Sequence, residues 1–565
     1  MSVFAPDLDA LGELAASFAR AYPALAPHLA ARSADPDVER LLEAFAYLTE
    51  RVHKLLDESP SATQSFATLV APELERAFPC STVVAIASPT ARRRVTAGAD
   101  FDSAPIGGAA CRFHAWSAFD LVPWSMEEAR IAWSATEGQS LVLRLAATGD
   151  GALASLFPLR LHFTGDTRVA LALQLYLRVH LARCELRVDD RVVDLGKALA
   201  AWGLRTEEAL LPPEPYEHPG LRLLREYHVL PAKFAFVEIA APAQEGTSAH
   251  VELRFFFDAQ LPLEMQVTPD NIRLNCVPVT NVFETTADPI SPSLERPVHV
   301  LRPAGIPLGL GEVYAVTRVT GGTGGTGGVV AEIPSWAEFE AAPPAAAFHV
   351  TERHTTIRGS EVRLSLGSPA DAGVLPDYDF VSIDIQATNG ALPNSLGIGD
   401  VCVSPEWQVR NIGAVTPYRP PASGEELRFR TLAMTTLAAV PLVAVEPLRT
   451  LLHVLNLHPL EDAQAARAHA QRLAAILTVN VTPGRARPAA GVDLGTVVLG
   501  HDIRITISNS GFDGEGDALV FSSVLARLFA HETAIGAFAR TTVRIVETGR
   551  TFAFPALHGD RVFEE

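Results

Sequence analysis

Prolines divide the stretch 223–290 into short pieces, and this limits what the chain can fold into more than any other feature. The stretch begins with a helical pattern, bends at Pro231 and continues as an apolar strand. Its second half interrupts short apolar runs at Pro269, Pro278 and Pro289. Because proline lacks a backbone N–H group and has a fixed φ, none of these runs can form a long central strand or helix.

The composition is typical of a globular protein with several domains. The chain has 565 residues, of which 48 % are hydrophobic and 20 % charged, and this length gives room for about three or four domains. No apolar run approaches the ~18 residues of a membrane-spanning helix; the richest, 437–445, is broken by Pro441. Asp7 and Asp9 stand where a signal peptide carries basic residues. We therefore expect a cytoplasmic protein without direct membrane insertion.

The cysteines predict reduced thiols. There are five of them, widely separated and without a Cys-x-x-Cys pair: Cys80, Cys111, Cys184, Cys276 and Cys402. An odd number with this spacing argues against a disulfide framework and against a zinc site.

The net charge of −19 limits the choice of partners. A nucleic-acid binder needs a basic face that displaces counterions, and anionic lipid is disfavoured for the same reason. We therefore expect no nucleic-acid partner. The negative charge either keeps a large protein soluble or attracts a basic partner.

Residues 1–79 are predicted to be a helical N-terminal segment. The pattern Asp35-Pro36 suits a helix start, and an apolar stripe at helical spacing follows it. The stripe consists of Val38, Leu41, Leu42, Phe45, Leu48, Val52 and Leu55. Such a helix either packs on its own domain or is offered to a partner subunit.

The rest of the chain is predicted to be β-rich, so the fold class is α+β with several domains. Residues 80–330 contain runs that alternate with period two and are separated by turn residues such as Asp189-Asp190, which favours antiparallel hairpins in sandwich-like or barrel-like domains. These runs are 82–86, 140–145, 159–163, 169–177, 184–193 and 251–257; the last is the most apolar and is expected inside a sandwich. A second β-rich domain is predicted for 331–482, with strands over about 345–450, among them 361–366 and 381–387.

Three further segments complete the predicted domain organisation. The run 321–328, built only from glycine and threonine, lacks the Gly-Lys-Ser/Thr ending of a phosphate loop and is predicted to be a flexible loop. Residues 461–478 form an alanine-rich helix, and 483–488 a linker. The C-terminal domain, 483–565, is a small α+β unit with a long helix over 519–538.

No motif in the sequence predicts a catalytic, cofactor-binding or metal-binding site. Asp513, Glu515 and Asp517 alternate as in a calcium loop, but the required glycine and glutamate are missing, so we interpret them as a tight turn before a helix. His453 and His458 lack the spacing of a zinc site. No Gly-x-Ser-x-Gly elbow is present. We therefore expect no enzyme activity and no cofactor.

Several blocks of sequence resemble the TssF family, also called VasA or ImpG, of the bacterial type VI secretion system. The opening FARAYPALAPHLA and ADPDVERLLEAFAYLTERVHKLLD is similar to the start of the family. The order REY, Pro, KF, then LNCVPVTNVF is similar to its central part, as are VSIDIQATNGALP and FDGEGDALVFSSVLARLF farther on. The resemblance extends from about Leu8 to Arg544. A family block with Trp and Asn-Tyr-Leu-Ser-Leu is replaced here by 427–430 and 435–439, so partner contacts cannot be carried over to those side chains.

The resemblance implies a structural subunit of the baseplate wedge, which supports assembly of the contractile tail. It further implies a TssG-like partner, with two copies of this chain per TssG, and therefore a second copy of the chain itself. A TssK-like subunit, sheath-initiating proteins and spike-hub proteins are the other implied partners. The implied location is the cytoplasm, docked at the inner-membrane complex after assembly. Two alternatives remain open at this stage: a carbohydrate-active β-sandwich enzyme, and an oligomeric scaffold outside secretion.

Overall fold

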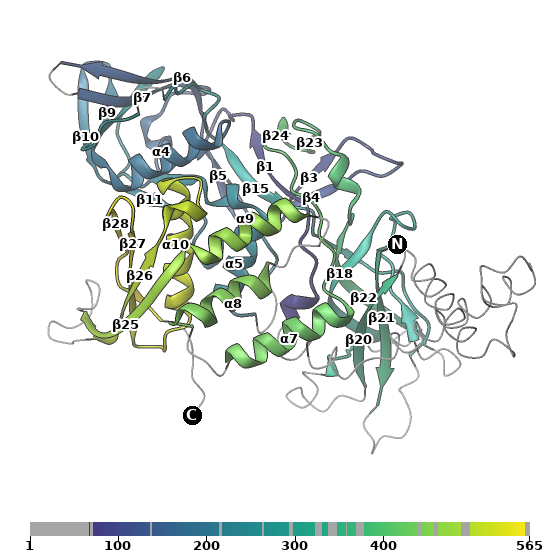
Figure 1. The fold of residues 1–565 in the computed structure, drawn as a ribbon. Helices are drawn as coiled ribbons and strands as arrows, with labels where there is room; N and C mark the ends of the chain where they lie inside the picture. The colour runs from purple at the N-terminus through teal and green to yellow at the C-terminus, as the bar shows by residue number, and fades with distance from the viewer. Residues whose placement is uncertain are drawn as a thin grey trace, which may run out of the picture. The chain divides into compact units, whose positions relative to one another are not determined.

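The computed structural model is an α+β chain with several sheets (Figure 1). It describes residues 67, 72–135, 138–213, 217–262, 265–292, 298–322, 330–336, 347–356, 359–368, 378–438, 442–456, 462–486 and 498–559. Contacts divide the chain into two units, Met1–Leu69 and Val70–Glu565, and nearly all described residues belong to the second. The helices predicted within 1–79 therefore lie outside the described residues, and the described part opens with the 3-10 turn η1, Pro72–Glu75.

The first sheet is a nearly closed barrel of six strands. In spatial order they are β23 (Val401–Val403), β3 (Ala99–Ser103), β4 (Arg112–Ala115), β15 (Cys276–Thr280), β1 (Ser81–Ile86) and β24 (Val409–Asn411). The buried side chain of Asn411 joins the two edge strands. Its Oδ1 accepts hydrogen bonds from the backbone N–H groups of Gly399 (2.8 Å) and Val401 (3.0 Å). Phe101, Phe113 and Val277 fill the interior.

Pro278 lies in the middle of this barrel, in β15. The strand is central, but it is only five residues long, as the proline spacing predicts. Pro278 is paired in register with Val83 of β1, whereas β15 meets β4 only at Thr280. The missing N–H group of Pro278 therefore removes no hydrogen bond from the ladder with β4.

Two further sheets share one extensive apolar core. One has the order β10 (Arg191–Gly196), β9 (Leu181–Val188), β13 (His250–Phe257), β7 (Gly138–Ala147) and β6 (Trp124–Ser134). The other has the order β11 (Leu199–Ala201), β12 (Phe236–Ile239), β8 (Leu159–Phe163) and β14 (Ile272–Arg273). The predicted hairpin over 184–193 is confirmed as β9 and β10, and β13 is central, as its apolar sequence predicts. A separate two-stranded sheet pairs β2 (Arg93–Val95) with β5 (Phe119–Leu121).

The strand predicted at 169–177 is wrong, because this segment is helix α4, Thr167–Val179. Asp166 caps the helix by accepting a hydrogen bond from the N–H of Arg168 (2.8 Å). Ala170, Leu173 and Leu177 then lie on one face and enter the core shared by the two sheets. Leucine and alanine favour helix over strand, and this preference outweighs the short alternating pattern.

A β-sandwich follows, made of two sheets with a common core. One sheet has the order β16 (Phe283–Thr286), β22 (Phe380–Thr388), β18 (Glu312–Gly322) and β19 (Val330–Glu332), and the other β17 (Val298–Val300), β21 (Gly359–Gly367) and β20 (Phe348–Thr356). Leu364 of β21 and Ile383 of β22 are both fully buried in this core. Because β18 pairs with β22, one sheet joins strands from both sides of residue 330. Of the predicted flexible loop 321–328, residues 321 and 322 end β18, and the others lie outside the described residues.

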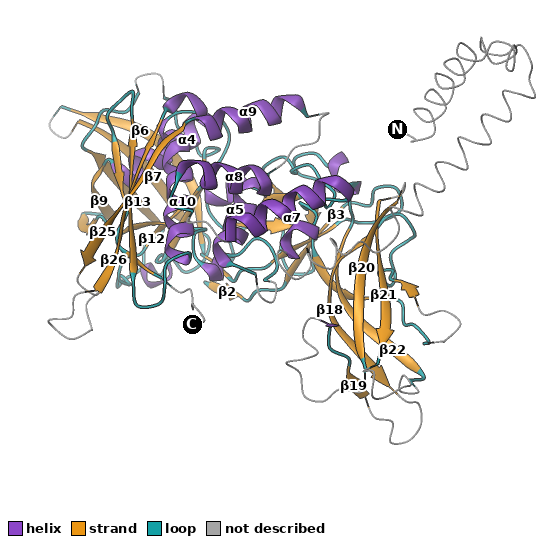
Figure 2. Cartoon of the chain, turned by 60° about the horizontal axis from the view of Figure 1, so that its bottom comes forward, coloured by secondary structure: helices purple, strands orange, loops and turns teal. Residues whose placement is uncertain are grey.

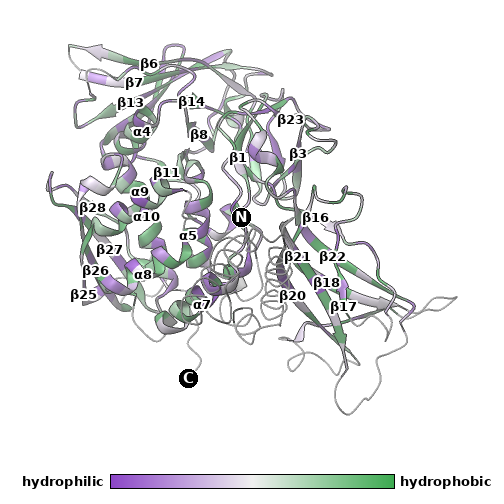
Figure 3. Ribbon diagram, turned by 45° about the vertical axis from the view of Figure 1, so that its right-hand side comes forward, coloured by the Kyte–Doolittle hydropathy of each residue, from purple (hydrophilic) through white to green (hydrophobic). Residues whose placement is uncertain are grey.

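Helices pack together between the sheets (Figure 2). They are α5 (Pro219–Val229), α7 (Gly424–Ala438), α8 (Val445–Leu455), α9 (Ala463–Ala474) and α10 (Glu515–His531). Strands are expected from the sequence up to about residue 450, so α7 and α8 correct that expectation (Figure 3). The helix predicted over 519–538 is shifted: it ends at His531, and Gly536 with φ +83° turns the chain into the next strand.

The last sheet is built around α10. Its order is β25 (Ile476–Ala486), β26 (Val498–Ile507), β27 (Phe538–Ile545) and β28 (Thr551–Ala553), with β29 (Leu557–His558) also on β27. β26 and β27 are parallel, as a connection through a helix requires. Pro483 does not begin a linker, because it lies within β25 opposite His501. The domain limits 1–79, 80–330, 331–482 and 483–565 thus stay a prediction, with β25 spanning the last of them.

Candidate interaction surfaces and internal junctions

Three consecutive residues of α5 hold three different parts of the chain. Successive helix positions point about 100° apart, so Arg225, Glu226 and Tyr227 face different neighbours. Arg225 Nη2 lies 3.4 Å from the hydroxyl of Tyr314 in β18. The hydroxyl of Tyr227 accepts a hydrogen bond from Arg472 Nη1 of α9 (2.7 Å). The sequence REY, singled out above by its unusual order, is therefore a structural junction.

Glu226 is the centre of this junction. Its Oε1 accepts hydrogen bonds from the N–H groups of Leu210 (2.8 Å) and Leu211 (3.0 Å). Its Oε2 forms an ion pair with Lys233 Nζ, and both side chains are almost completely buried. Burial lowers the pKa of Lys233, and Glu226 opposes this shift. Buried Lys–Glu pairs also occur in enzyme active sites. Here the partners of Glu226 are Lys233 and two backbone N–H groups, so the pair joins structural elements.

The described cysteines are unpaired thiols, as predicted, and four of them are buried. Burial raises the pKa of the Cys80, Cys184 and Cys276 thiols to about 12. Since the thiolate is the reactive form, these groups are inert packing residues. Cys402 is exposed.

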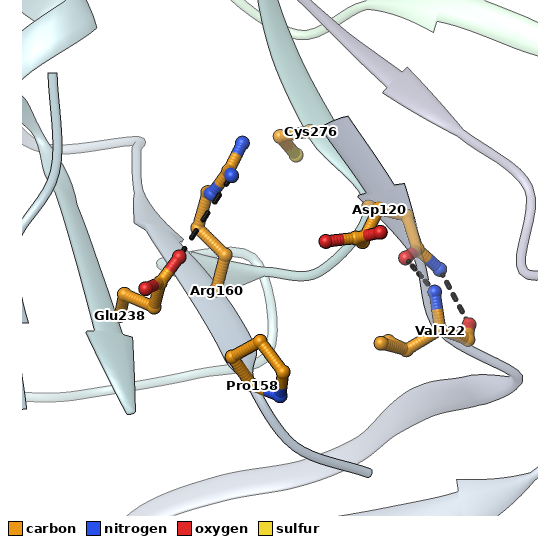
Figure 4. Close-up of a pocket in the computed structure, with 7 residues that line it drawn as sticks. Asp120, Val122, Pro158, Arg160, Glu238 and Cys276 are labelled. Carbon is orange, nitrogen blue, oxygen red and sulfur yellow. Dashed lines mark hydrogen bonds and ion pairs between the residues drawn. The ribbon is translucent and has the colours of Figure 1, made fainter. Parts of the chain in front are cut away.

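A small cavity lies beside Arg160 on β8 (Figure 4). The guanidinium stacks over Trp202 at 4.1 Å and lies 3.8 Å from a carboxylate oxygen of Glu238. Asp120 and Cys276 complete the wall. The cavity offers about 10 Å³ to the centres of water molecules, which is room for about one water. It cannot hold a sugar.

The acidic residues at the start of α10 do not converge on a common point. Asp517 pairs with Arg472 and accepts a hydrogen bond from the N–H of Asp513 (3.2 Å). Glu515 instead pairs with Arg550 at 2.7 Å. The interpretation as a tight turn before a helix is confirmed, since Gly514 has φ +97° and α10 begins at the next residue.

Histidines far apart in the sequence meet where α5, α8 and α9 pack together. The ring of His469 lies 5.8 Å from that of His228 and 6.1 Å from that of His453. In the sequence, the histidine nearest to His453 is His458, which lies outside the described residues. Within the described part of the chain, no group of three or more His, Cys, Asp or Glu side chains is placed to hold a metal ion.

One helix presents apolar side chains to solvent. On α7, Leu427, Met434 and Leu437 are buried, whereas Phe429 is 52 % and Leu432 69 % exposed. These two lie three residues apart and therefore on the same face of the helix. Phe429 lies in the segment 427–430, where the chain departs from the TssF pattern, and Leu432 lies just after it.

The comparisons with known proteins cover nearly the whole chain. A family profile described as "Type VI secretion system, TssF" matches residues 1–561. The chain belongs to the TssF family. The Pseudomonas aeruginosa protein described as "Type VI secretion system component TssF1" is 26 % identical, over 98 % of this chain and 98 % of that protein.

Two solved structures have the TssF-family fold seen here. A chain of the type VI secretion system TssK-TssF-TssG baseplate subcomplex is 25 % identical, with a TM-score of 0.75 over 93 % of this chain and 99 % of that chain. A chain of the type VI secretion system baseplate complex has a TM-score of 0.67 over 99 % of both chains at 23 % identity, which supports the fold alone.

The polar residues of this TssF-family chain are used mainly to join its own elements. The junctions around α5 and the turn before α10 each connect segments that are distant in sequence, and none surrounds a cavity of substrate size. Among the described helices, none is long and apolar enough to cross a membrane.

Proposed function

We propose that this chain is a structural subunit of the type VI baseplate wedge, and that it acts by binding other subunits. The observation that carries the proposal is the match along nearly the whole chain to a protein solved within a TssK-TssF-TssG baseplate subcomplex, with a TM-score of 0.75. The proposed partners are a TssG-like and a TssK-like subunit. The proposed stoichiometry is two copies of this chain per TssG, with sheath-initiating and spike-hub proteins as further neighbours.

The internal chemistry of the chain supports a binding role. Its buried charged groups, such as Glu226 and Lys233, are engaged with one another and with backbone groups. The proposed location is the cytoplasm, with docking at the inner-membrane complex once the baseplate has formed. No catalytic, cofactor-binding or metal-binding residue is proposed. A carbohydrate-active enzyme has no support from the relatives, which are baseplate components.

Co-expression with the TssG-like and TssK-like subunits of the same locus tests this proposal. We expect the full-length chain to co-elute with both, and native mass spectrometry to give a mass equal to two chains per TssG. A stable complex with a one-to-one mass would refute the stoichiometry. A chain that elutes alone at micromolar concentration, with both subunits folded, would refute the function.

A further inference from the structure

The long edge strand β25 lacks, over most of its length, the charged side chains that protect the other long edges of the described sheets, although Pro483 removes one donor from it. Edge strands normally carry charged residues that prevent pairing with other chains. β6, β10 and β20 follow this rule with Glu127 and Arg130, Arg191 and Asp194, and Glu352. β25 is eleven residues long, and its residues 476–484 contain no charged side chain. Such an edge is a template for an additional strand.

Pro483 indicates which backbone groups face the open edge. A proline within a strand is tolerated where its nitrogen points away from the neighbouring strand. In an antiparallel ladder, successive residues present their N–H and C=O groups to opposite sides. The peptide groups of Val479, Val481 and Pro483 therefore point outward, while Thr478 and Asn480 pair with β26 opposite Thr506 and Arg504.

The two faces of β25 differ, and this determines the pattern of a strand that could be added. The register places Val479 and Val481 beside Ile505 and Ile503, whose buried side chains face the core of this domain. Asn480 lies beside Arg504 on the opposite face. An added strand must therefore alternate apolar and polar residues, with the apolar ones on the Val479 side.

The outer face of this sheet is basic, although the whole chain has a net charge of −19. Arg504, Arg540 and Arg544 share it with Asp502, by the register of β26 and β27. Asp502 pairs with Arg540 at 2.7 Å. Arg504 and Arg544 are exposed, and within the described part of the chain no carboxylate pairs with either. The polar positions of an added strand therefore favour acidic residues.

A second copy of β25 does not provide the acidic residues that the basic face favours. Residues 476–484 contain no acidic side chain, so self-pairing would leave Arg504 without a negative partner. Pro483 of each copy would also remove one donor from the shared ladder. A different protein fits the edge better than a second copy does.

We propose that β25 binds an extended segment of another protein, in which apolar residues alternate with acidic ones, as an additional strand of the C-terminal sheet. This deepens the proposed assembly function, which requires edges or faces that join subunits. The occupant is defined by its chemistry: β-branched or other apolar residues beside Val479 and Val481, and carboxylates beside Arg504.

A labelled peptide of sequence Glu-Val-Thr-Val-Glu-Val-Thr, added to the full-length chain, tests the proposal by fluorescence anisotropy. We expect saturable binding, and slower hydrogen exchange at the amides of Val479 and Val481. Val481→Pro should weaken binding about tenfold because it removes one outward N–H donor. Val481→Thr keeps that N–H and should bind within about twofold of the original chain.

A charge reversal provides the second arm, at an exposed position where the fold is not at risk. Arg504→Glu should weaken binding of the acidic peptide about tenfold and favour the analogue with Lys in place of Glu. Equal binding of a scrambled peptide, unchanged binding to the Val481→Pro chain, or no binding at millimolar peptide would overturn the proposal. Self-association that Val481→Pro abolishes would also overturn it, since the occupant would then be a second copy.

The result of the peptide-binding test can be distinguished from the result of the co-elution test of the proposed function. A Val481→Pro chain that loses the peptide but still co-elutes with the TssG-like subunit leaves the proposed function standing and supports the edge as a distinct surface. A chain that binds the peptide but no TssG-like subunit supports the edge and refutes the proposed function.

Discussion

Replacing Lys233 by methionine tests whether the buried ion pair holds α5 in place. Lys233 is fully buried and Glu226 is 2 % exposed, so the carboxylate would lose its counter-charge and keep only its two backbone N–H donors. Removing one partner of a buried pair destabilises by about 3–5 kcal/mol. The free energy of unfolding of a domain is about 5–15 kcal/mol, so this loss is a large fraction of the total.

The double variant Glu226→Gln with Lys233→Met separates charge from packing. The glutamine oxygen can still accept from the N–H groups of Leu210 and Leu211, and no uncompensated charge remains. Neutral replacement of a buried pair often costs little, so the double variant should recover most of the loss. The expected interaction energy in the cycle is about 2–3 kcal/mol.

Hydrogen exchange with mass spectrometry is the suitable assay, because a chain with several sheets does not unfold in one step. Peptides that cover 219–239 should exchange faster in Lys233→Met and near the original rate in the double variant. Peptides from β21 in the sandwich serve as the internal control. Unchanged exchange in Lys233→Met, or strictly additive effects of the two substitutions, would refute the assigned role of the pair.

Three further predictions concern other sites. Burial lowers the pKa of His162 from 6.5 to about 3, so below pH 6.5 the unfolded chain binds a proton that the folded chain does not, and the free energy of unfolding falls by about 1.4 kcal/mol per pH unit down to about pH 3. In His162→Gln the melting temperature should fall less between pH 6.5 and pH 4.5 than in the original chain; an equal fall would contradict this. Asn411→Ala should lower the free energy of unfolding by about 1–3 kcal/mol, since the buried N–H group of Val401 loses this acceptor, while that of Gly399 keeps the backbone oxygen of Asn411. Asn411→Asp should also lower the melting temperature, because it removes the amide that donates to the carbonyls of Gly397 and Gly413; melting temperatures equal to that of the original chain would argue against the role of Asn411 in barrel closure. Phe429→Glu with Leu432→Glu should leave the melting temperature within about 2 °C, because both side chains are exposed, and should reduce co-elution with the TssG-like or TssK-like subunit. Thr450→Glu, at an exposed position of α8, is the control; undiminished co-elution of the double variant with both subunits would exclude this face of α7 as an interface.

Local patterns in the sequence predicted many of the strands but fewer of the helices. The hairpin of β9 and β10 was predicted because alternation and Asp189-Asp190 point to the same structure, and Asp189 has the positive φ of such a turn. Helix α4 was missed because Val169–Leu177 is apolar with a short alternating pattern, and only the cap at Asp166 distinguishes it from a buried strand. Pro483 was interpreted as a linker because the sequence does not show that its nitrogen faces an open edge.

The internal junctions could not be predicted at all from spacing. Arg472 meets Tyr227 and Asp517, which are hundreds and tens of residues away, and no local pattern encodes such a meeting. The unusual order of REY, Pro and KF identified the right segment, but through family resemblance. What the sequence did establish was the absence of linear motifs for catalysis, and this agrees with a family of structural subunits.

The position of α10 has a consequence for the order in which the chain is made. This helix contacts α5 and α4, although hundreds of residues separate it from them in the sequence, so both remain uncovered while the ribosome synthesises the residues between them. Domains generally fold as they emerge from the N-terminus, but this one closes only after α10 has been synthesised. A transcript cut short before residue 515 therefore yields a chain with an open apolar surface, which chaperones and proteases can recognise before it enters an assembly.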